Sequence, residues 1–174
     1  EQVVEQAFAR AEHTDHDEHN LVARLRGSEA FIPELSLVAE QDGVPVGYAY
    51  AGKFHERAAY DWSVETSIYV EQHRKRQGIG RLLHDALEQE LQRRHFLNMN
   101  ACVACPIGEN DPYLTRDSIC FHEKLGYRMV GEFHQCGYKF GRWYDMVWME
   151  KHIGSHTSNQ PEIKKFSEIK IDIG

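Results

Sequence analysis

The feature that most constrains the fold is a glycine turn between a strand-like run and a long amphipathic pattern. Residues Trp62 to Val70 are rich in β-branched and aromatic side chains, which favours a strand. The turn Lys75-Arg76-Gln77-Gly78-Ile79-Gly80-Arg81 follows, and apolar residues then recur at the spacing of one helical face. Such a turn directs backbone N–H groups into one concavity, where the helix N-terminus adds partial positive charge. We therefore predict an anion-binding loop at residues 75–81.

The remaining periodic segments predict a single domain of the α/β (α+β) class. Strands are expected at residues 35–41, 44–51, 62–70, 97–104, 127–135 and 143–150. Helices are expected at residues 1–11, 18–26, from the glycine turn, with an apolar face that begins at Ile79, to about His95, and at 117–125, where Gly126 ends the last one. Asp42-Gly43 suits a tight hairpin between the first two strands. We expect a mixed, mostly antiparallel central sheet flanked by helices.

The composition is that of a globular protein with one core. The chain has 174 residues, of which 41% are hydrophobic and 27% are charged. Its apolar runs fall far short of the ~20 residues of a membrane helix, and no signal peptide is visible, so we expect a cytoplasmic protein without a membrane partner. Glu1 is not a methionine, and we expect the chain to have been trimmed. The formal net charge of -7 argues against a nucleic-acid partner, since phosphate binding needs clustered excess Lys and Arg.

Four cysteines are interpreted as free thiols, since a chain of this length does not need a disulfide framework. They are Cys102, Cys105, Cys120 and Cys136. Cys102 and Cys105 form a C-x-x-C pair, but on a strand their side chains point to opposite faces. No second pair stands at zinc-finger spacing. We predict that this pair is buried in the core and binds no metal.

Three histidines near the start of the chain raise the question of a metal site. His13, His16 and His19 are spaced by three residues and could share a helical face. They alternate with acidic residues, a composition typical of solvated surface loops. We favour the solvated loop and predict no bound metal.

Three further motifs, together with the glycine loop, resemble a known family. The pattern Q/R-x-x-G-x-G/A after an apolar strand is similar to the acetyl-CoA pyrophosphate loop of the GNAT superfamily of N-acetyltransferases. Within that superfamily, the segments Tyr60–Val70, Phe121–Tyr127 and Gly137–Asp145 look like the phosphinothricin acetyltransferase group. The matching motifs cover residues 57 to 150 in the expected order. The resemblance implies a GNAT-like acetyltransferase domain at residues 1–151 and a C-terminal tail at residues 152–174.

The resemblance also implies roles for individual residues. Glu65 stands at the position of the family's general base and His122 at that of its active-site histidine. Such chemistry suits these groups, because an alkyl amine is mostly protonated at neutral pH and must lose a proton before it attacks a thioester. A backbone N–H of the Glu65–Val70 strand would stabilise the oxyanion. The residues implied for acetyl-CoA binding are Ile68, Tyr69, Val70, Lys75, Arg76, Gln77, Gly78, Ile79, Gly80, Arg81 and Ser118.

The motifs indicate less clearly which residues would bind the acceptor amine. Arg57 is a candidate clamp for an acceptor carboxylate, with a solvated surface arginine as the alternative, and Trp62 is a candidate wall of the acceptor pocket. Thr115 stands where the family shows asparagine, and the loop from Pro106 to Leu114 is longer than usual. The first 50 residues match the phosphinothricin group poorly.

The expected function is acetyl-CoA-dependent acetylation of the primary amine of a small amino-acid-like molecule of the phosphinothricin or methionine sulfoximine type. The alternatives are acetylation of peptide or protein amines, and a non-catalytic acetyl-CoA-binding module. A sensor of that last kind has no need of both Glu65 and His122.

The tail ends in a segment that resembles a half-buried strand. Glu168 to Ile173 alternates polar residues with three isoleucines. We hypothesise that it fills an open sheet edge beside residues 35–41, in its own subunit or in the partner of a homodimer. The alternative is a disordered chain end.

Overall fold

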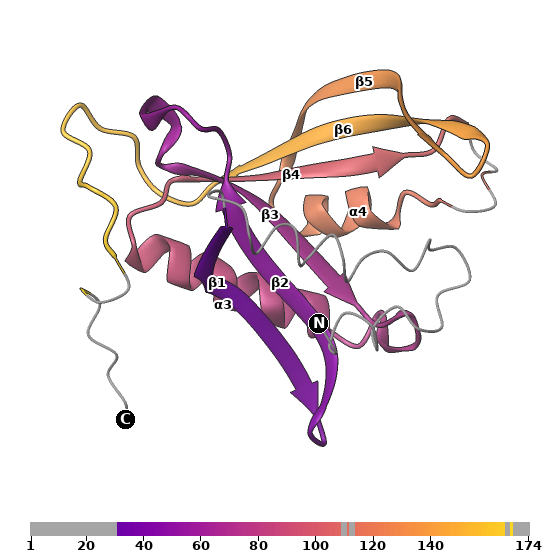
Figure 1. Cartoon of the computed structure of the whole chain (residues 1–174), viewed down its shortest axis with the longest axis horizontal. Coiled ribbons are helices and arrows are strands. Elements are labelled where there is room, and N and C mark those ends of the chain that lie inside the picture. The colour runs from indigo at the N-terminus through magenta and orange to yellow at the C-terminus, as the bar shows by residue number, and fades with distance from the viewer. Residues whose placement is uncertain (1–30, 109–110, 112–113, 166–167, 169–174) are drawn as a thin grey trace.

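In the computed structural model, which describes residues 31–108, 111, 114–165 and 168, the strands form a six-stranded sheet. Its order is β1-β2-β3-β4-β6-β5 (Figure 1). All neighbouring strands are antiparallel except β3 and β4, which are parallel. The strands are β1 Phe31–Gln41, β2 Val44–Lys53, β3 Ser63–Val70, β4 Asn98–Cys105, β5 Arg128–Lys139 and β6 Arg142–His152.

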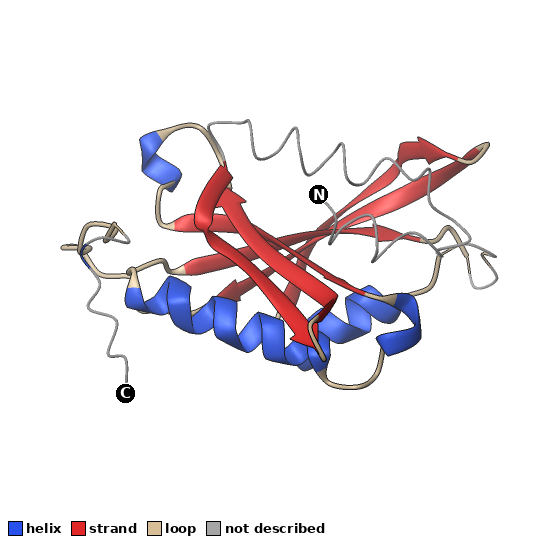
Figure 2. Ribbon diagram, turned by 60° about the horizontal axis from the view of Figure 1, so that its bottom comes forward, coloured by secondary structure: helices blue, strands red, loops and turns tan. Residues whose placement is uncertain are grey.

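Both described helices cover the same face of this sheet, as Figure 2 shows. Helix α3, Ile79–Arg93, packs against β1, β2 and β3, and helix α4, Asp117–Lys124, packs against β4. Two short 3-10 turns, η1 Ala58–Tyr60 and η2 Gln72–Arg74, flank β3. Leu83, Leu87 and Leu91 recur on one side of α3 and enter the core. The core of the described residues therefore lies between the helices and one face of the sheet.

The described elements confirm the predicted mixed α/β fold. The glycine at each helix boundary explains why both helices were found from the sequence: Gly78, at φ 85°, precedes α3, and Gly126, at φ 91°, follows α4. The helices predicted at 1–11 and 18–26 lie outside the described residues, together with His13, His16 and His19. The tail strand is almost entirely outside them too, so its place beside β1 stays a prediction.

The last hairpin is longer than predicted. Strands β5 and β6 continue to Lys139 and from Arg142, leaving a two-residue turn at Phe140 and Gly141. Both turn residues have positive φ values of 54° and 73°, the geometry that tight hairpins favour. Tyr138 pairs with Trp143 across the hairpin, with ring centroids 5.0 Å apart. This aromatic pair stabilises the added strand residues.

The cysteines are free, as predicted, but only partly buried. Cys105 is buried, whereas Cys102, Cys120 and Cys136 are exposed. The prediction that both members of the C-x-x-C pair lie in the core was therefore wrong for Cys102. The two side chains alternate along β4, so when Cys105 faces the helices, Cys102 must face the opposite side.

The segment after β6 packs along the far end of α3. Ile153 N donates to Leu97 O at 2.7 Å, and Lys164 N donates to Arg94 O at 3.1 Å. Ile163 packs against the core. The described part of the tail thus closes the end of the sheet where β3 and β4 begin. Neither described helix has the length and hydrophobicity that crossing a membrane requires.

Candidate active site

The sheet opens between its two parallel strands. β3 and β4 pair only through Ser63 with Asn98, Val64 with Met99, and Glu65 with Asn100. Beyond Glu65 the strands diverge, and each stays paired to its outer neighbour, β2 or β6 (Figure 1). The edges that face each other across this split expose backbone donors and acceptors that a bound chain-like molecule can satisfy. Glu65 belongs to the last pair and stands at the apex of the split.

Glu65 lies on the face of the sheet opposite the helices. Its neighbours Val64 and Thr66 are buried on the helix side, so strand alternation turns Glu65 outward. The side chain is half-buried, and burial raises the pKa of its carboxyl above the ordinary value. A carboxylate with a raised pKa is a stronger proton acceptor, as a general base requires.

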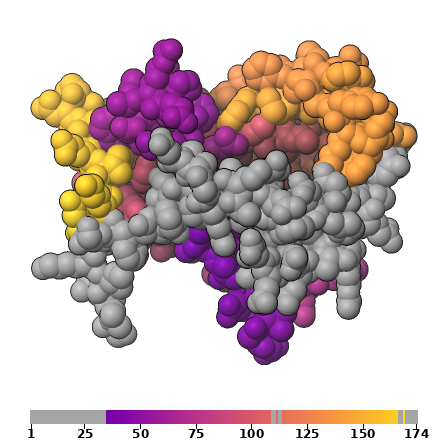
Figure 3. All heavy atoms as spheres, in the orientation of Figure 1, coloured from indigo at the N-terminus to yellow at the C-terminus, as the bar shows by residue number. Residues whose placement is uncertain are grey.

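The surface on this outward side is hollowed. In Figure 3, the segment around η1 and the β5–β6 hairpin rise on either side of a depression with β4 at its base. Cys102 of β4 lies near Glu65: burial and the Glu65 charge raise the pKa of its thiol to about 11. Trp148 pairs with Cys102 across β4 and β6, and Phe54 packs edge-on against it at 5.6 Å. Cys102, Trp148 and Phe54, which lie on this side of the sheet, carry no charge near neutral pH.

His122 lies on the helix side, in the second turn of α4. Its Nδ1–H donates to Ser118 O at 2.7 Å, since a carbonyl can only accept, and this bond fixes the ring. Burial lowers the pKa of the imidazole. The ring is therefore neutral at pH 7, with its proton on Nδ1 and a lone pair on Nε2.

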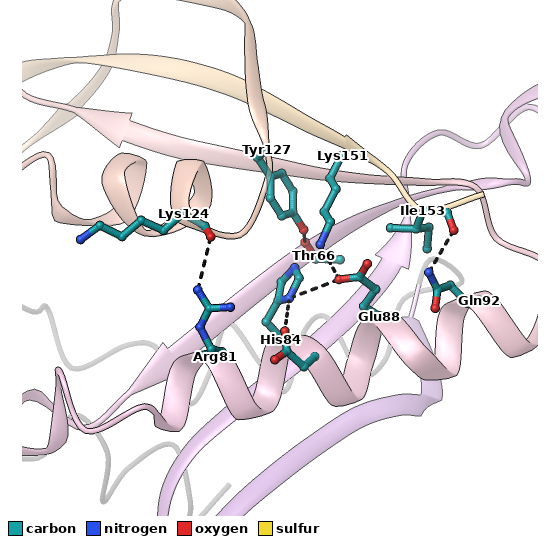
Figure 4. A network of polar contacts seen from close by, with 10 residues as sticks. Thr66, Arg81, His84, Glu88, Gln92, Lys124, Tyr127, Lys151 and Ile153 are labelled. Carbon is teal, nitrogen blue, oxygen red and sulfur yellow. Dashed lines mark hydrogen bonds and ion pairs between the residues drawn. The ribbon is translucent and has the colours of Figure 1, made fainter. Parts of the chain in front are cut away.

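Tyr127 connects His122 to the strands at the split. Its ring packs edge-on against His122 at 5.0 Å and against His84 of α3 at 5.6 Å. Its hydroxyl lies 3.5 Å from Thr66 Oγ1, and Figure 4 shows Tyr127, Thr66 and His84 converging between α3 and β3. His84 is fully buried, and within the described chain its Nε2 has no hydrogen-bond partner. Burial raises the pKa of Tyr127 to about 12.

Glu65 and His122, the two predicted catalytic residues, are thus separated by the sheet. They can act on a common molecule only where β3 and β4 part. Nothing in the linear sequence reveals this separation, because it depends on which face each side chain takes.

The predicted anion-binding loop has the expected geometry. Arg76 and Gly78 are both left-handed, at φ 63° and 85°, and they turn the chain into α3. A Cβ on Gly80 would lie 3.2 Å from the Phe121 ring of α4, so this glycine allows the two helices to approach closely. First-turn N–H groups of a helix have no partner within the helix. With Lys75 and Arg81 exposed beside them, the loop combines donors and positive charge.

Three of the residues predicted for acetyl-CoA lie on the open side of the split. Ile68, Tyr69 and Val70 form the part of β3 that has parted from β4. Ser118 is in the first turn of α4, next to Asp117, whose carboxylate lies 3.7 Å from Arg76. The loop and the start of α4 therefore meet at one end of the opening.

The two predicted acceptor residues lie in different places. Arg57 is exposed at the start of η1. Trp62 donates its indole N–H to Pro161 O at 2.8 Å, so it anchors the tail at the closed end of the strands. In the extended loop, Asp111 accepts a hydrogen bond from Leu114 N at 2.9 Å.

Comparison with known proteins identifies the family. The family model described as Acetyltransferase (GNAT) domain matches residues 1–148. A phosphinothricin N-acetyltransferase of Streptomyces viridochromogenes is 38% identical over 66% of this chain and 58% of its own length. A Salmonella typhimurium L-methionine sulfoximine/L-methionine sulfone acetyltransferase is 32% identical over 70% of this chain and 67% of its own.

A solved structure supports the same assignment. The GNAT superfamily phosphinothricin acetyltransferase of Sinorhizobium meliloti, in complex with AcCoA, is 28% identical, with a TM-score of 0.67 over 92% of this chain and 84% of that one. The match to the first curated relative spans less than two thirds of that protein's length. Since the family model covers most of the sequence, the chain belongs to the GNAT acetyltransferase family.

Proposed function

We propose that this chain is an acetyl-CoA-dependent N-acetyltransferase acting on the primary amine of a small amino-acid-like molecule of the phosphinothricin or methionine sulfoximine type. The observation that carries the proposal is the split between β3 and β4. A carboxyl group with a raised pKa stands at its apex, and an anion-binding loop lies at its open side. The similarity to the phosphinothricin and methionine sulfoximine acetyltransferases supports this acceptor class.

The residues around the split fit acetyl-CoA, which supplies an acetyl group activated as a thioester. Backbone N–H groups of residues 77–81 would hold the pyrophosphate at the N-terminus of α3. Lys75, Arg76 and Arg81 add positive charge beside it. The free edge of β3 at residues 68–70 offers hydrogen bonds to the pantetheine arm.

Glu65 would prepare the acceptor amine. The amine is mostly protonated at neutral pH, with a pKa of about 8 to 10, and its nitrogen has no lone pair until that proton leaves. Glu65 accepts the proton, directly or through one water molecule. The freed nitrogen then forms the amide C–N bond as the thioester C–S bond breaks.

His122 would serve a second proton transfer from the helix side. Because Nδ1–H is held by Ser118 O and the ring is neutral, Nε2 can accept a proton but has none to donate. This favours a relay that first takes up the second amine proton, over an imidazole that begins the reaction as an acid. The proton then passes from the relay to the departing CoA thiolate or to solvent, which returns the ring to its neutral form.

We also propose that the enzyme is cytoplasmic, works without nucleic acid or membrane, and forms a homodimer. The net charge of -7 supports the first exclusion. Light scattering of the purified chain gives its mass in solution, and a monomeric mass would reject the dimer.

The function is tested by thiol release from acetyl-CoA with a panel of amino acids, simple amines and peptides, using Glu65→Gln as the control. Turnover with amino-acid-like acceptors is expected. Turnover with peptides alone would favour the protein-amine alternative. Acetyl-CoA binding without release on any acceptor would favour the non-catalytic module.

A further inference from the structure

Two hydrogen bonds outside the regular ladder join β3 to β4 at the apex of the split. Asn100 Nδ2 donates to Val64 O at 3.0 Å, and Thr66 Oγ1 donates to Asn100 O at 3.2 Å. Both side chains are buried, at 8% and 4% exposure. We call these two contacts the apex bonds.

The apex bonds hold the strands from opposite faces of the sheet. Asn100 is paired with Glu65 and therefore lies on the outward face, whereas Thr66 points toward the helices. The apex bonds occur at the last residue pair before the strands diverge. Without them, the pairing between β3 and β4 could open at this pair or extend by one more pair. Two-sided bonding at this position fixes where the split begins.

Thr66 is itself supported from the helix side. Its hydroxyl proton is used by Asn100 O, so the nearby Tyr127 hydroxyl, at 3.5 Å, is the donor of that contact. The Tyr127 ring is in turn packed between His84 and His122. A chain of contacts thus runs from α4 through the sheet to the residue beside Glu65.

We propose that Thr66 and Asn100 are positioning residues for acetyl transfer, which hold the Glu65 carboxyl at the apex by fixing the point where β3 and β4 part. This inference rests on the proposed function. Moving the branch point by one residue would displace the pairing by about 3.3 Å. Displacement of a reacting group by about 1 Å can already cost about 100-fold in rate.

The experiment compares Thr66→Val, which has the same shape without the hydroxyl, with Thr66→Ser, which restores it. Asn100→Ala removes the other apex bond. Gln92→Ala is the matched control, since it loses a side-chain bond of 3.0 Å to Ile153 O at the far end of α3. We expect Thr66→Val and Asn100→Ala to lower kcat by about 10- to 100-fold. KM for acetyl-CoA should stay unchanged, and Thr66→Ser and Gln92→Ala should keep near wild-type kcat.

A second readout does not depend on turnover. A 13C NMR titration of the Glu65 carboxyl should show its raised pKa in the wild type, in Thr66→Ser and in Gln92→Ala. In Thr66→Val and Asn100→Ala the pKa should fall toward the ordinary value, because the freed strand end exposes the carboxyl to water. A purely stabilising role would lower the melting temperature without moving this titration.

Unchanged kcat and unchanged Glu65 titration in both Thr66→Val and Asn100→Ala would overturn the inference. So would a Thr66→Ser variant as impaired as Thr66→Val, since the hydroxyl would then be irrelevant. If one variant fails to fold in a thermal melt, the other and the serine variant decide. If the wild type transfers acetyl to no acceptor, the proposed function fails, and the titration still decides whether the apex bonds place Glu65.

Discussion

At the split, each face of the sheet carries a titratable group, and burial shifts the pKa values of the two groups in opposite directions. On the outward face, burial raises the pKa of Glu65, which makes the carboxylate a better proton acceptor. On the helix face, burial lowers the pKa of His122, which keeps the imidazole neutral. One physical cause thus prepares two different groups. In the proposed mechanism the two groups are not interchangeable, because Glu65 takes the amine proton and the neutral His122 ring can only relay one.

The largest effect is expected from a substitution that prevents CoA binding, because both faces of the sheet then lack the cofactor. Gly78→Val should abolish CoA binding in calorimetry, because a β-branched residue resists φ 85° and fills space that the phosphates need. The fold should survive, since no atom lies within 4 Å of a Cβ built there. Gly141→Val is the matched control, with φ 73° and open space at the β5–β6 turn, and it should bind CoA normally. Wild-type affinity in Gly78→Val would exclude this loop as the pyrophosphate site.

The next largest effect is expected when Glu65, the titratable group on the outward face, can no longer accept a proton. Glu65→Gln should bind CoA but lose at least about 100-fold in turnover near neutral pH, which is the usual worth of a general base. The deficit should shrink as pH approaches the pKa of the acceptor amine, because solvent then removes the proton. Steady-state rates from pH 6 to pH 10 measure this. Equal rates for variant and wild type at pH 7 would remove Glu65 from the mechanism.

Substitution of His122, the titratable group on the helix face, should lower turnover less than substitution of Glu65. His122→Ala should lower turnover by about 10-fold, below the full worth of an acid–base group, while CoA affinity stays near wild type. His122→Asn keeps a donor for Ser118 O but lacks the second ring nitrogen. If Nε2 is the relay, this variant should be as slow as the alanine variant. A collapse of CoA affinity in either one would instead make His122 a cofactor contact.

Much of this architecture could be predicted from local sequence patterns. The period-2 runs located the strands, and Gly78 and Gly126 marked helix boundaries because only glycine adopts their backbone angles readily. The split could not be predicted, since a strand pattern does not name its partner or say where pairing stops. For the same reason, the sequence does not predict that Glu65 and His122 lie on opposite faces of the sheet.

The apex bonds cannot be predicted from the sequence for a related reason. Asn100 and Thr66 look like ordinary polar residues in apolar strands, although an asparagine within Leu97–Ala104 does signal a buried group that needs partners. His84 likewise interrupts the apolar stretch of α3. Such interruptions were the available clue to the polar contacts beneath the split, but they do not indicate which groups meet.

The smallest expected effect is a pH dependence of stability with opposite sign for the two faces. The pKa of Glu65 is higher in the folded state than its unfolded value of about 4.3. The protonated carboxyl therefore stabilises the fold below the unfolded pKa, and this contribution is lost as pH rises from the unfolded to the folded pKa. Glu65→Gln should therefore melt like the wild type at low pH and somewhat higher at neutral pH. His122 has a folded pKa below its unfolded value of about 6.5, so stability is lost as pH falls beneath it. His122→Asn should gain on the wild type in that acid range.

Differences between each variant and the wild type remove the contribution of His84, whose buried ring also has a lowered pKa. The differences should be small, because Glu65 is only half-buried and solvent screens its charge. For a chain of this size, about 1 kcal/mol corresponds to about 2–4 °C in Tm. Thermal melts from pH 4 to pH 8 should show the two difference curves rising in opposite directions. Flat curves for both variants would mean that burial does not set either pKa, and the contrast between the faces would lose its physical cause.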